Sequence, residues 1–318
     1  METKTKYAEY CKNAKLPIFN KNWWLDAVCG PDNWDVIVIE KDNRIIASWP
    51  YYLRKNVLRK TIISMPLQTQ TLGPWLEYPL NIKYVNKLSY EKKICRQLIS
   101  LLPKVFDFSQ NFHYSITNWL PFYWAGFTQT TRYTYIIEDT SDLNKILENF
   151  DGSKRTDINK ALNYKIKIID NFHFIDFYNY HRDCLKNQGK HITYSEKLFI
   201  NIYNACTMND SCKILAAIDD KNIIHAAIFL VYDSDCVYNL ISAIDSKYRY
   251  SGASTLLFLE TIKLAASLNL KYNFEGSMIE AIEDSYRKFG GRQVPYFSIR
   301  KTYSKFLPLL ISLKGIIK

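Results

Sequence analysis

Residues 236–277 decide the fold of the second half of the chain, and they read CVYNLISAIDSKYRYSGASTLLFLETIKLAASLNLKYNFEGS. The apolar run at 236–244 predicts a buried strand. A polar loop follows at 245–252, and the apolar-periodic segment behind it predicts a helix over 253–268. Residues 271–275 predict the next strand. A helical crossover between two strands of one sheet makes these strands parallel.

The flanking segments extend this pattern on both sides. Strand candidates at 213–219 and 223–232 come before it, joined by a polar turn at 220–222. A helix candidate at 279–289 follows and ends at Gly290-Gly291, and a last strand candidate covers 294–300. Three antiparallel strands therefore lead into a parallel crossover, which predicts an α/β fold with a mixed sheet.

The first part of the chain also predicts a mixture of helices and strands. Strands are expected at 34–40, 44–53, 61–65 and 112–117, with Asp42-Asn43 as the turn between the first two. Helices are expected at 23–29 and 90–102, and a loop at 66–79. The second part begins near Tyr133, and its expected helices cover 139–150, 153–163, 174–187 and 195–208. Thr140 or Ser141 is the expected cap of the first of these helices.

The composition excludes several classes of protein. A chain of 318 residues with 47% hydrophobic and 23% charged residues is an ordinary globular protein of about two domains. Its seven cysteines are scattered without a Cys-x-x-Cys pair, so neither a disulfide framework nor a metal site is expected. No apolar run approaches the roughly 18 residues of a membrane span, and no signal core is visible. A cytoplasmic location follows as the expectation.

The positive charge is concentrated near the end of the chain. The net charge is +11, and no acidic residue follows Asp284. Such a basic segment can contact phosphates or remain a solvated face. The last residues, 306–318, read FLPLLISLKGIIK and combine apolar side chains with lysines. They are expected either to pack against the domain or to make a weak contact with the inner face of a membrane.

The loop between the third strand and the helix resembles the phosphate loop of GNAT acyltransferases. Arg249 and Gly252 match the pattern Arg/Gln-x-x-Gly-x-Gly/Ala, and Ser254 departs from it. Backbone N–H groups at a helix N-terminus form an anion site, here for the pyrophosphate of coenzyme A. The resemblance implies acetyl-CoA or another acyl-CoA as donor, held by Arg249, Tyr250, Ser251, Gly252, Ala253 and Ser254. Glycine and serine are also ordinary at the start of a helix.

Further motifs narrow the resemblance to bacterial GNAT proteins related to the Fem-type peptidoglycan aminoacyltransferases. These motifs are Phe274-Glu275-Gly276-Ser277-Met278, the run from Phe289 to Tyr296, Trp119 to Phe127, Thr131 to Tyr135, and Arg155-x-x-Ile158-x-Lys160-Ala161. The resemblance covers about residues 23–301. Fem-type proteins consist of two GNAT-like halves, which implies a GNAT-like half at 1–130, a catalytic half at 131–305 and a tail at 306–318. The helical-hairpin arm of several Fem proteins has no evident counterpart.

Acyl transfer to an amine needs a base, a polarised carbonyl and an acid for the leaving group. Glu275, at the end of its strand, and His225, on the neighbouring hairpin, are the candidate bases, and each has a structural alternative as a hydrogen-bonded buried group. The resemblance implies that Tyr286 protonates the leaving group, and simple packing of its ring is the alternative. Ser277 is given a positioning role, because no activated nucleophile is visible. Transfer is expected to be direct.

The expected function is transfer of an acyl group from acyl-CoA to an amine. The resemblance implies a small-molecule or lipid-linked amino-sugar acceptor from a cell-surface polysaccharide or its precursor. The candidate acceptor-binding residues are Arg155, Lys160, Gln188 and Lys190, with solvated helix charges as the alternative reading. Two other functions stay open: aminoacyl-tRNA-dependent transfer onto a cell-wall precursor, and a non-catalytic GNAT-fold binding module. No nucleic acid other than tRNA is expected as a partner.

Overall fold

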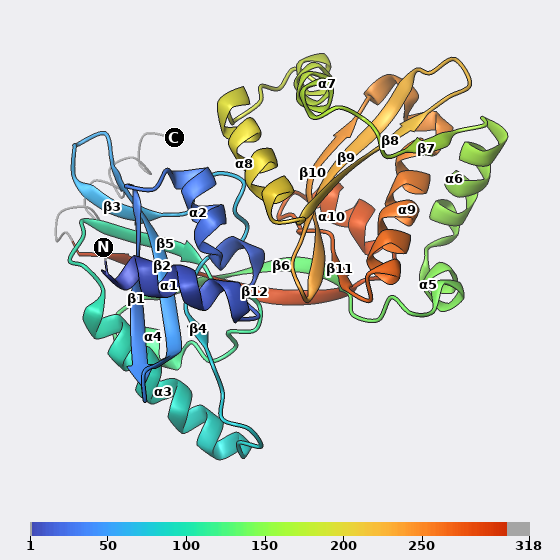
Figure 1. Cartoon of the computed structure of the whole chain (residues 1–318). Coiled ribbons are helices and arrows are strands. Elements are labelled where there is room, and N and C mark those ends of the chain that lie inside the picture. The colour runs from blue at the N-terminus through green and yellow to red at the C-terminus, as the bar shows by residue number, and fades with distance from the viewer. Residues whose placement is uncertain (1, 304–318) are drawn as a thin grey trace, which may run out of the picture. The chain divides into compact units, whose positions relative to one another are not determined.

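The structure is a computed structural model that describes residues 2–303 and divides into two compact units. Unit 1 comprises residues 2–132 and 295–303, and unit 2 comprises Tyr133–Val294 (Figure 1). The residues expected to form a tail, 306–318, lie outside the described part of the chain. Each unit contains strands and helices of its own.

Unit 1 holds a sheet in the order β1-β2-β3-β5-β12, with the short strand β4 beside β2. Neighbouring strands are antiparallel except β3 and β5, which are parallel and are separated in sequence by the long helix α3. The Asp42-Asn43 turn between β1 and β2 has both residues at positive φ, as tight hairpins require. The elements are α1 (Glu2–Asn13), η1 (Ile18–Asn20), α2 (Asn22–Cys29), β1 (Trp34–Lys41), β2 (Arg44–Lys55), β3 (Thr61–Ser64), β4 (Trp75–Leu76), α3 (Tyr84–Leu101), β5 (Asp107–Asn111), α4 (Leu120–Trp124) and β12 (Arg292–Thr302).

The core of unit 1 is built around Trp49, whose side chain is fully buried. Its ring makes edge contacts with Phe108, Phe112 and Phe122, each with centroids 5.7 Å apart. Its indole Nε1 donates to Gln110 Oε1 at 2.6 Å, which satisfies the one polar atom of the ring. The aromatic cluster therefore joins β2, β5 and α4.

Unit 2 holds a second sheet in the order β6-β11-β10-β9-β8-β7. Strands β7 to β10 are antiparallel to one another, β11 is parallel to β10, and β6 is antiparallel to β11. This is the mixed sheet that the sequence predicts. The elements are β6 (Thr128–Ile137), α5 (Leu143–Asn149), α6 (Gly152–Asn163), β7 (Lys167–Ile169), α7 (Phe174–Asn187), α8 (Glu196–Met208), β8 (Cys212–Ile218), β9 (Ile224–Tyr232), β10 (Cys236–Ile244), η2 (Ser246–Ser251), α9 (Ala253–Ser267), β11 (Lys271–Asn273) and α10 (Glu280–Arg287).

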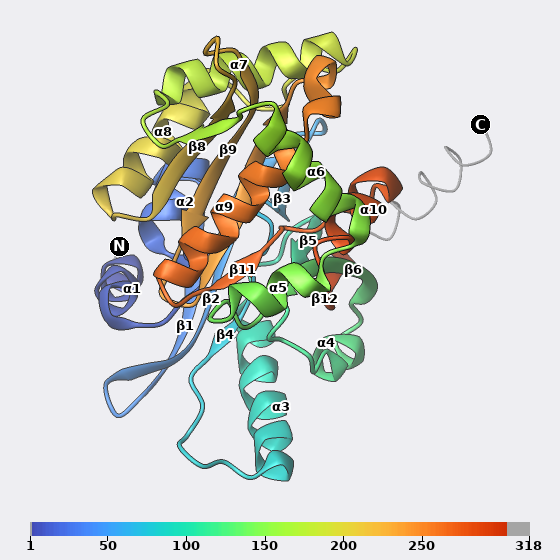
Figure 2. The same cartoon turned by 90° about the vertical axis from the view of Figure 1, so that its right-hand side faces the viewer.

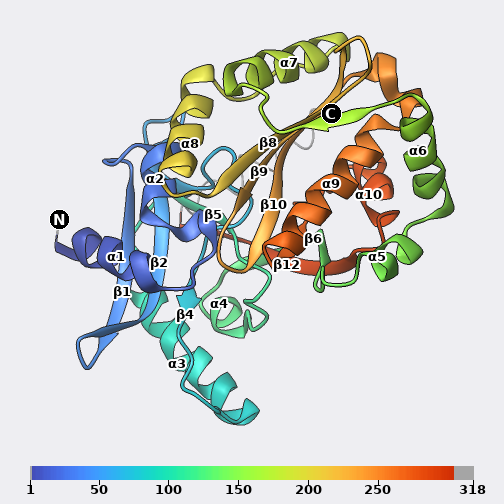
Figure 3. The ribbon, with the colours of Figure 1, turned by 45° about the vertical axis from the view of Figure 1, so that its right-hand side comes forward.

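Helices cover both faces of the β8–β10 strands (Figure 3). On one face Ala226, Ile228 and Leu230 of β9 pack into the cluster that contains α9. On the other face Phe229 contacts Phe177 of α7 at 6.1 Å and Phe199 of α8 at 5.3 Å between ring centroids. A strand buried on both faces needs a continuous apolar run, which is what 226–231 supplies.

Four local expectations differ from the structure. In place of the strand expected at 112–117, the structure has β5 at Asp107–Asn111. The apolar alternation of β5 is hard to recognise in the sequence because one of its buried positions holds the polar residue Gln110. Helix α3 begins at Tyr84 instead of residue 90. The cap of α5 is Asp142, whose carboxylate accepts the N–H groups of Asn144 and Lys145, whereas the Thr140 hydroxyl donates to the Leu270 carbonyl. The short elements α1, α4 and β4 were not expected.

The boundary between the units also differs from the expected 130/131 division. Unit 2 begins at Tyr133, and residues 295–303 belong to unit 1, because β12 pairs with β5 from Ser298 to Thr302. Within residues 2–303, no helix is long and apolar enough to cross a membrane. Within the same residues, no three His, Cys, Asp or Glu side chains are placed to hold a metal ion.

Truncation of the Phe229 side chain tests the core of unit 2. We expect Phe229→Ala to lower the free energy of unfolding by about 3–5 kcal/mol, because a fully buried ring leaves a cavity. Leu162→Ala, at a side chain that is 58% exposed, is the control and should change stability by less than about 0.5 kcal/mol. Far-UV circular dichroism in denaturant measures both variants. All seven tryptophans lie in unit 1, so tryptophan fluorescence follows the unfolding of unit 1 separately from that of unit 2. Equal effects of the two substitutions would contradict the packing.

Candidate functional site

Strand β10 continues after its parallel partner β11 has ended. The two strands pair only from Cys236–Lys271 to Tyr238–Asn273, whereas β10 remains paired with β9 up to Ile244. The register with β9 shifts between Asn239 and Ile241, which marks a bulge at the same point. Among the described strands, none pairs with β10 beyond Tyr238 on the β11 side. Backbone groups on that side can therefore bind an extended ligand.

Polar side chains gather where β10 and β11 separate. The Ser242 hydroxyl donates to Asn239 Oδ1 at 2.9 Å, and Asn239 Nδ2 donates to the hydroxyl of Tyr286 at 3.4 Å. The Tyr286 ring, from α10, packs on Phe274 with centroids 5.4 Å apart and on Phe258 at 5.9 Å. The ring is thus held by apolar contacts while its hydroxyl is aimed at the polar residues of β10.

The Tyr286 hydroxyl stays protonated at neutral pH. Burial raises its pKa, the hydrogen bond from Ser242 lowers it, the Glu275 carboxylate raises it and the Asn239 hydrogen bond lowers it, with a net value of about 12. A phenol with this pKa is a proton donor and not a base.

Glu275 occupies a tight turn directly after β11. It has a φ of +60°, and its N–H donates to Asn273 Oδ1 at 2.8 Å, an atom that also accepts the Thr134 hydroxyl. The next residue, Gly276, has a φ of +43°, and a Cβ there would lie 2.2 Å from the Tyr133 carbonyl oxygen. The turn is therefore pressed against β6, and burial raises the pKa of the Glu275 carboxyl well above its ordinary value. Among the predicted site residues, Glu275 follows the end of β11 and Tyr286 is hydrogen-bonded to Asn239 of β10, where the pairing of β10 and β11 ends.

Ser277 and His225 have other surroundings. The Ser277 hydroxyl accepts the N–H of Ile279 at 3.0 Å, just before α10 begins. His225 is buried, with Nδ1 3.0 Å from Ser251 Oγ and Nε2 3.4 Å from Asp219 Oδ2. Its ring also stacks on Tyr248 at 4.2 Å. These contacts connect the β8–β9 turn to η2. They fit the structural alternative, in which His225 is a buried, hydrogen-bonded residue.

The predicted phosphate loop is covered by α6. Arg249 and Tyr250 are exposed and Ser254 is half-buried, but Ser251, Gly252 and Ala253 are buried. A Cβ on Gly252, which has a φ of +72°, would lie 2.0 Å from the Asp157 carbonyl oxygen of α6. The Ala253 N–H already donates to Ser251 Oγ at 3.3 Å.

A carboxylate also lies at the N-terminus of α9. The Thr255 hydroxyl donates to Asp157 Oδ2 at 3.4 Å, so an acidic side chain occupies the positive end of the helix dipole. An incoming phosphate would meet this negative charge, and the Ala253 N–H is already bonded to Ser251 Oγ. In this arrangement the loop does not fit a pyrophosphate.

The four predicted acceptor-binding residues each have a separate place. Arg155 Nη1 donates to the carbonyls of Phe150 and Glu148 and so caps the C-terminus of α5. Lys160 pairs with Asp157 at 3.2 Å on the same helix. Gln188 Nε2 donates to the Ile244 carbonyl at the end of β10, at 3.3 Å, and Lys190 is exposed. Only Gln188 contacts the strand that carries Asn239.

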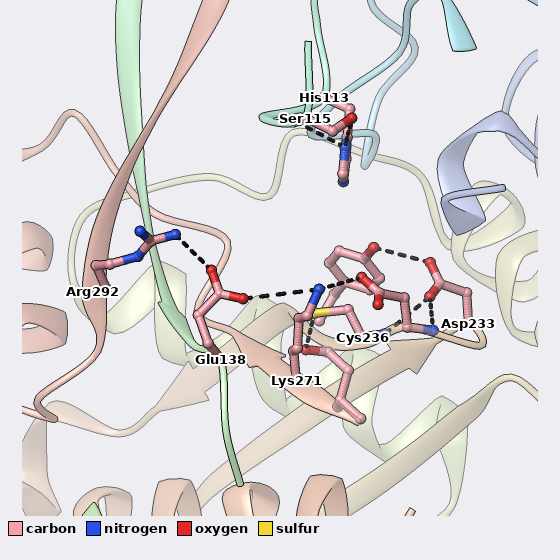
Figure 4. A network of polar contacts seen from close by, with 10 residues as sticks. His113, Ser115, Glu138, Asp233, Cys236, Lys271 and Arg292 are labelled. Carbon is pink, nitrogen blue, oxygen red and sulfur yellow. Dashed lines mark hydrogen bonds and ion pairs between the residues drawn. The ribbon is translucent and has the colours of Figure 1, made fainter. Parts of the chain in front are cut away.

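A second polar network holds the other end of β11 (Figure 4). Lys271 Nζ lies 3.1 Å from Asp235 and 3.9 Å from Glu138, and Arg292 pairs with Glu138 at 2.8 Å. Asp233 accepts the N–H groups of Asp235 and Cys236. These contacts hold the start of β11 against the end of β6 and the turn before β10, so we assign them a structural role. The His113–Ser115 hydrogen bond of 2.8 Å in the same figure belongs to unit 1.

Asn239, Ser242 and Asp157 are not among the residues that the sequence predicts for the site. The signal for the first two is visible, since they are polar residues inside the apolar run 236–244. Asp157 had no such signal, because its role depends on the packing of α6 onto α9. A cavity of about 940 Å³ lies in unit 1 among Lys6, Tyr10, Arg44 and Glu77, and none of the predicted site residues lines it.

Comparison with solved structures identifies the fold. FemX matches with a TM-score of 0.65 at 12% identity, over 93% of this chain and 95% of FemX. The C-terminal domain of a candidate lysylphosphatidylglycerol synthetase from Agrobacterium fabrum matches with a TM-score of 0.53 at 10% identity, over 99% and 95%. A tandem GNAT protein from the clavulanic acid biosynthesis pathway matches with a TM-score of 0.51 at 8% identity, over 95% of each chain.

No protein-family model and no curated protein matches the chain. At identities this low, the likeness to the solved structures concerns the fold. The chain has the fold of Fem-type and tandem GNAT proteins, and the predicted resemblance and fold class are confirmed.

Two glycine substitutions test the cover over the loop. Gly252 and Gly189 have nearly the same φ, +72° and +68°, but a Cβ at Gly189 meets nothing within 4 Å. We expect Gly189→Ala to cost about 1–2 kcal/mol of stability, which is the left-handed backbone penalty alone. Gly252→Ala should cost clearly more, since its methyl group would displace α6. Denaturant unfolding measures both variants, and equal costs would mean that α6 does not pack on the loop.

The raised pKa of Glu275 predicts a pH-dependent stability. The folded state keeps a proton on this carboxyl that the unfolded state releases near pH 4.3. The contribution of the carboxyl to the free energy of unfolding is therefore complete below about pH 4.3, and it is lost as the pH rises toward the pKa of the folded state. The melting temperature of Glu275→Gln relative to the natural chain should therefore increase from pH 5 to pH 8. The exposed Glu280→Gln is the control and should show no such trend. A constant difference for Glu275→Gln would contradict the burial of the carboxyl.

Proposed function

We propose that the chain transfers an acyl group from an activated ester to an amine, with Glu275 as general base and Tyr286 as general acid. The observation that carries the proposal is the arrangement at the point where β10 loses its parallel partner: Glu275 follows the end of β11, and the Tyr286 hydroxyl accepts a hydrogen bond from Asn239 of β10. A carboxylate whose pKa is raised by burial is a stronger base for an ammonium group than an exposed one. The fold is one that acyltransferases use.

The proposed reaction balances without a covalent enzyme intermediate. Glu275 removes a proton from the acceptor amine, whose nitrogen attacks the ester carbonyl and forms the amide bond. The bond from the carbonyl carbon to the leaving group breaks, and Tyr286 protonates that group. The proton on Glu275 then restores the Tyr286 hydroxyl. Backbone N–H groups of β10 beyond Tyr238 are the proposed donors to the carbonyl oxygen as it gains negative charge.

The acidity of Tyr286 favours an oxygen ester over a thioester as donor. A simple thiol has a pKa of about 8.5, so a phenol of pKa about 12 would protonate the thiolate uphill. An alkoxide is more basic than a thiolate, so the same proton transfer to an alcohol leaving group is less unfavourable. The covered loop points the same way, because coenzyme A needs a pyrophosphate site there. We therefore propose an aminoacyl ester, as in charged tRNA, as the donor class.

Acyl-CoA remains the second candidate donor. It is favoured by the loop pattern and by the exposed Arg249 next to it, and it requires α6 to leave Gly252. The acceptor that we propose is an amino sugar or another amine of a cell-envelope precursor, and this choice rests on the family resemblance alone.

A donor panel tests the proposal directly. Labelled aminoacyl-tRNA and labelled acetyl-CoA are each incubated with the chain and a set of amino-sugar acceptors, and labelled amide is measured. We expect amide from the ester donor, and about a hundredfold less with Glu275→Gln, which lacks the base. Tyr286→Phe should also lose activity, whereas the exposed Glu280→Gln should retain it. Amide from acetyl-CoA alone, or full activity of Glu275→Gln, would show that the proposed donor or base is wrong.

A further inference from the structure

Helix α3 presents only positive charge to solvent. Its single acidic residue, Glu91, is buried, where it accepts hydrogen bonds from Tyr78 at 2.9 Å and Asn118 at 3.0 Å. Its basic residues, together with the lysine that precedes it, lie at or near the surface: Lys83, Lys87, Lys92, Lys93 and Arg96. Glu91 also lies 3.9 Å from Lys87 Nζ, so Lys87 has an acidic partner on α3, and Lys92, Lys93 and Arg96 have none among the ion pairs of the described residues.

The same surface exposes large apolar side chains. Leu80, Tyr84 and Val85 are 95%, 74% and 66% exposed, and they lie at the beginning of α3 and in the loop before it. Figures 1 and 2 show this end of α3 projecting away from the strands of unit 1. Single exposed apolar residues are common, but a cluster at a projecting helix end is typical of an interaction site.

One stripe of α3 joins this apolar end to α4. At 100° per residue, Val85, Leu88, Lys92 and Arg96 fall within an arc of about 80° on the helix surface. The Arg96 guanidinium lies over the ring of Trp124 in α4, 5.5 Å from its centroid. Helix α4 also exposes its side chains, with Leu120, Tyr123 and Trp124 exposed by 49%, 58% and 53%. We call the residues 80–96 and 120–124 that are named here the α3–α4 surface.

We propose that the α3–α4 surface docks on an anionic lipid bilayer. Lysine and arginine side chains bind anionic headgroups, while tyrosine and tryptophan rings prefer the boundary between headgroups and acyl chains. Aliphatic side chains such as those of Leu80 and Val85 gain by entering the bilayer edge. A nucleic acid would use the cations but would leave these aliphatic side chains in water, so the combination favours lipid.

None of the residues of the α3–α4 surface belongs to 306–318 or to the residues proposed for catalysis. It therefore predicts membrane association that is independent of the reaction. An enzyme held in this way would meet acceptors that are linked to lipid.

Vesicle co-sedimentation of the full chain tests the proposal. Phosphatidylcholine vesicles with and without phosphatidylglycerol are compared at low and high salt. We expect binding to the anionic vesicles only, and a loss of about tenfold or more in the variant Lys92→Glu/Lys93→Glu. Its matched control is Lys186→Glu/Lys197→Glu, which changes two exposed lysines on α7 and α8 and gives the same net charge. Tyr84→Ser/Val85→Ser should weaken the binding that persists at high salt. Salt screens the attraction between the lysines and the headgroups, so the remaining binding comes from the apolar side chains.

The outcomes separate this proposal from its competitors. Circular dichroism is used first to check that each variant is folded. We expect all of them to fold, because every substituted side chain is exposed. Equal losses in the two charge variants would show that net charge, and not this surface, drives binding. No binding of the natural chain to anionic vesicles would overturn the proposal. If the natural chain bound RNA but not vesicles, and Lys92→Glu/Lys93→Glu abolished the binding to RNA, the surface would be a nucleic-acid site and the lipid assignment would be wrong.

Discussion

The candidate site depends on one constraint, the unequal length of two parallel strands. Pairing between β10 and β11 stops at Tyr238 and Asn273, and the chain leaves β11 through a turn in which Glu275 and Gly276 both have positive φ. A longer β11 would fill the side of β10 where Asn239 and Ser242 lie, and it would carry Glu275 away from Tyr286. The polar side chains are therefore brought together by the end of backbone pairing. A non-glycine residue in the left-handed region is costly, and here it coincides with the proposed base.

The loop before α9 shows that one sequence pattern can serve two physical purposes. Small residues at a helix N-terminus allow a phosphate to approach the backbone, and they equally allow another helix to approach it. In this chain Gly252 lets α6 come close, and Asp157 supplies the negative charge that the helix dipole favours. The preference for an anion at this helix end is thus met within the protein. A donor that needed the same position would have to displace both the packing contact and the charge.

Most of unit 2 could be predicted from the sequence because its signals are local. The strands β8 to β10, the helix α9 and the helix α10 follow from apolar runs and turn residues, and their bounds agree with the structure to within a few residues. Helix α1 gave no such signal, since it buries only Tyr7 and Cys11 among polar residues. The role of Asp157 and the structural role of Arg155 depend on contacts between elements. Periodicity does not contain that information, and a resemblance to a family cannot supply it for a single residue.

The positive charge of the chain illustrates the same point. The sequence places eight basic residues after Asp284 without any acidic one, and this suggests a cationic end. Folding neutralises part of it, because Arg287 and Lys288 pair with Asp284 and Arg292 pairs with Glu138. In α3 the acidic residue Glu91 is buried, where its carboxylate accepts hydrogen bonds from Tyr78 and Asn118 and pairs with Lys87, while Lys92, Lys93 and Arg96 lie at the surface. The electrostatic field outside a protein depends on which charges remain unpaired at the surface, so a cationic face can arise on α3 although the count of basic residues along the chain is highest elsewhere.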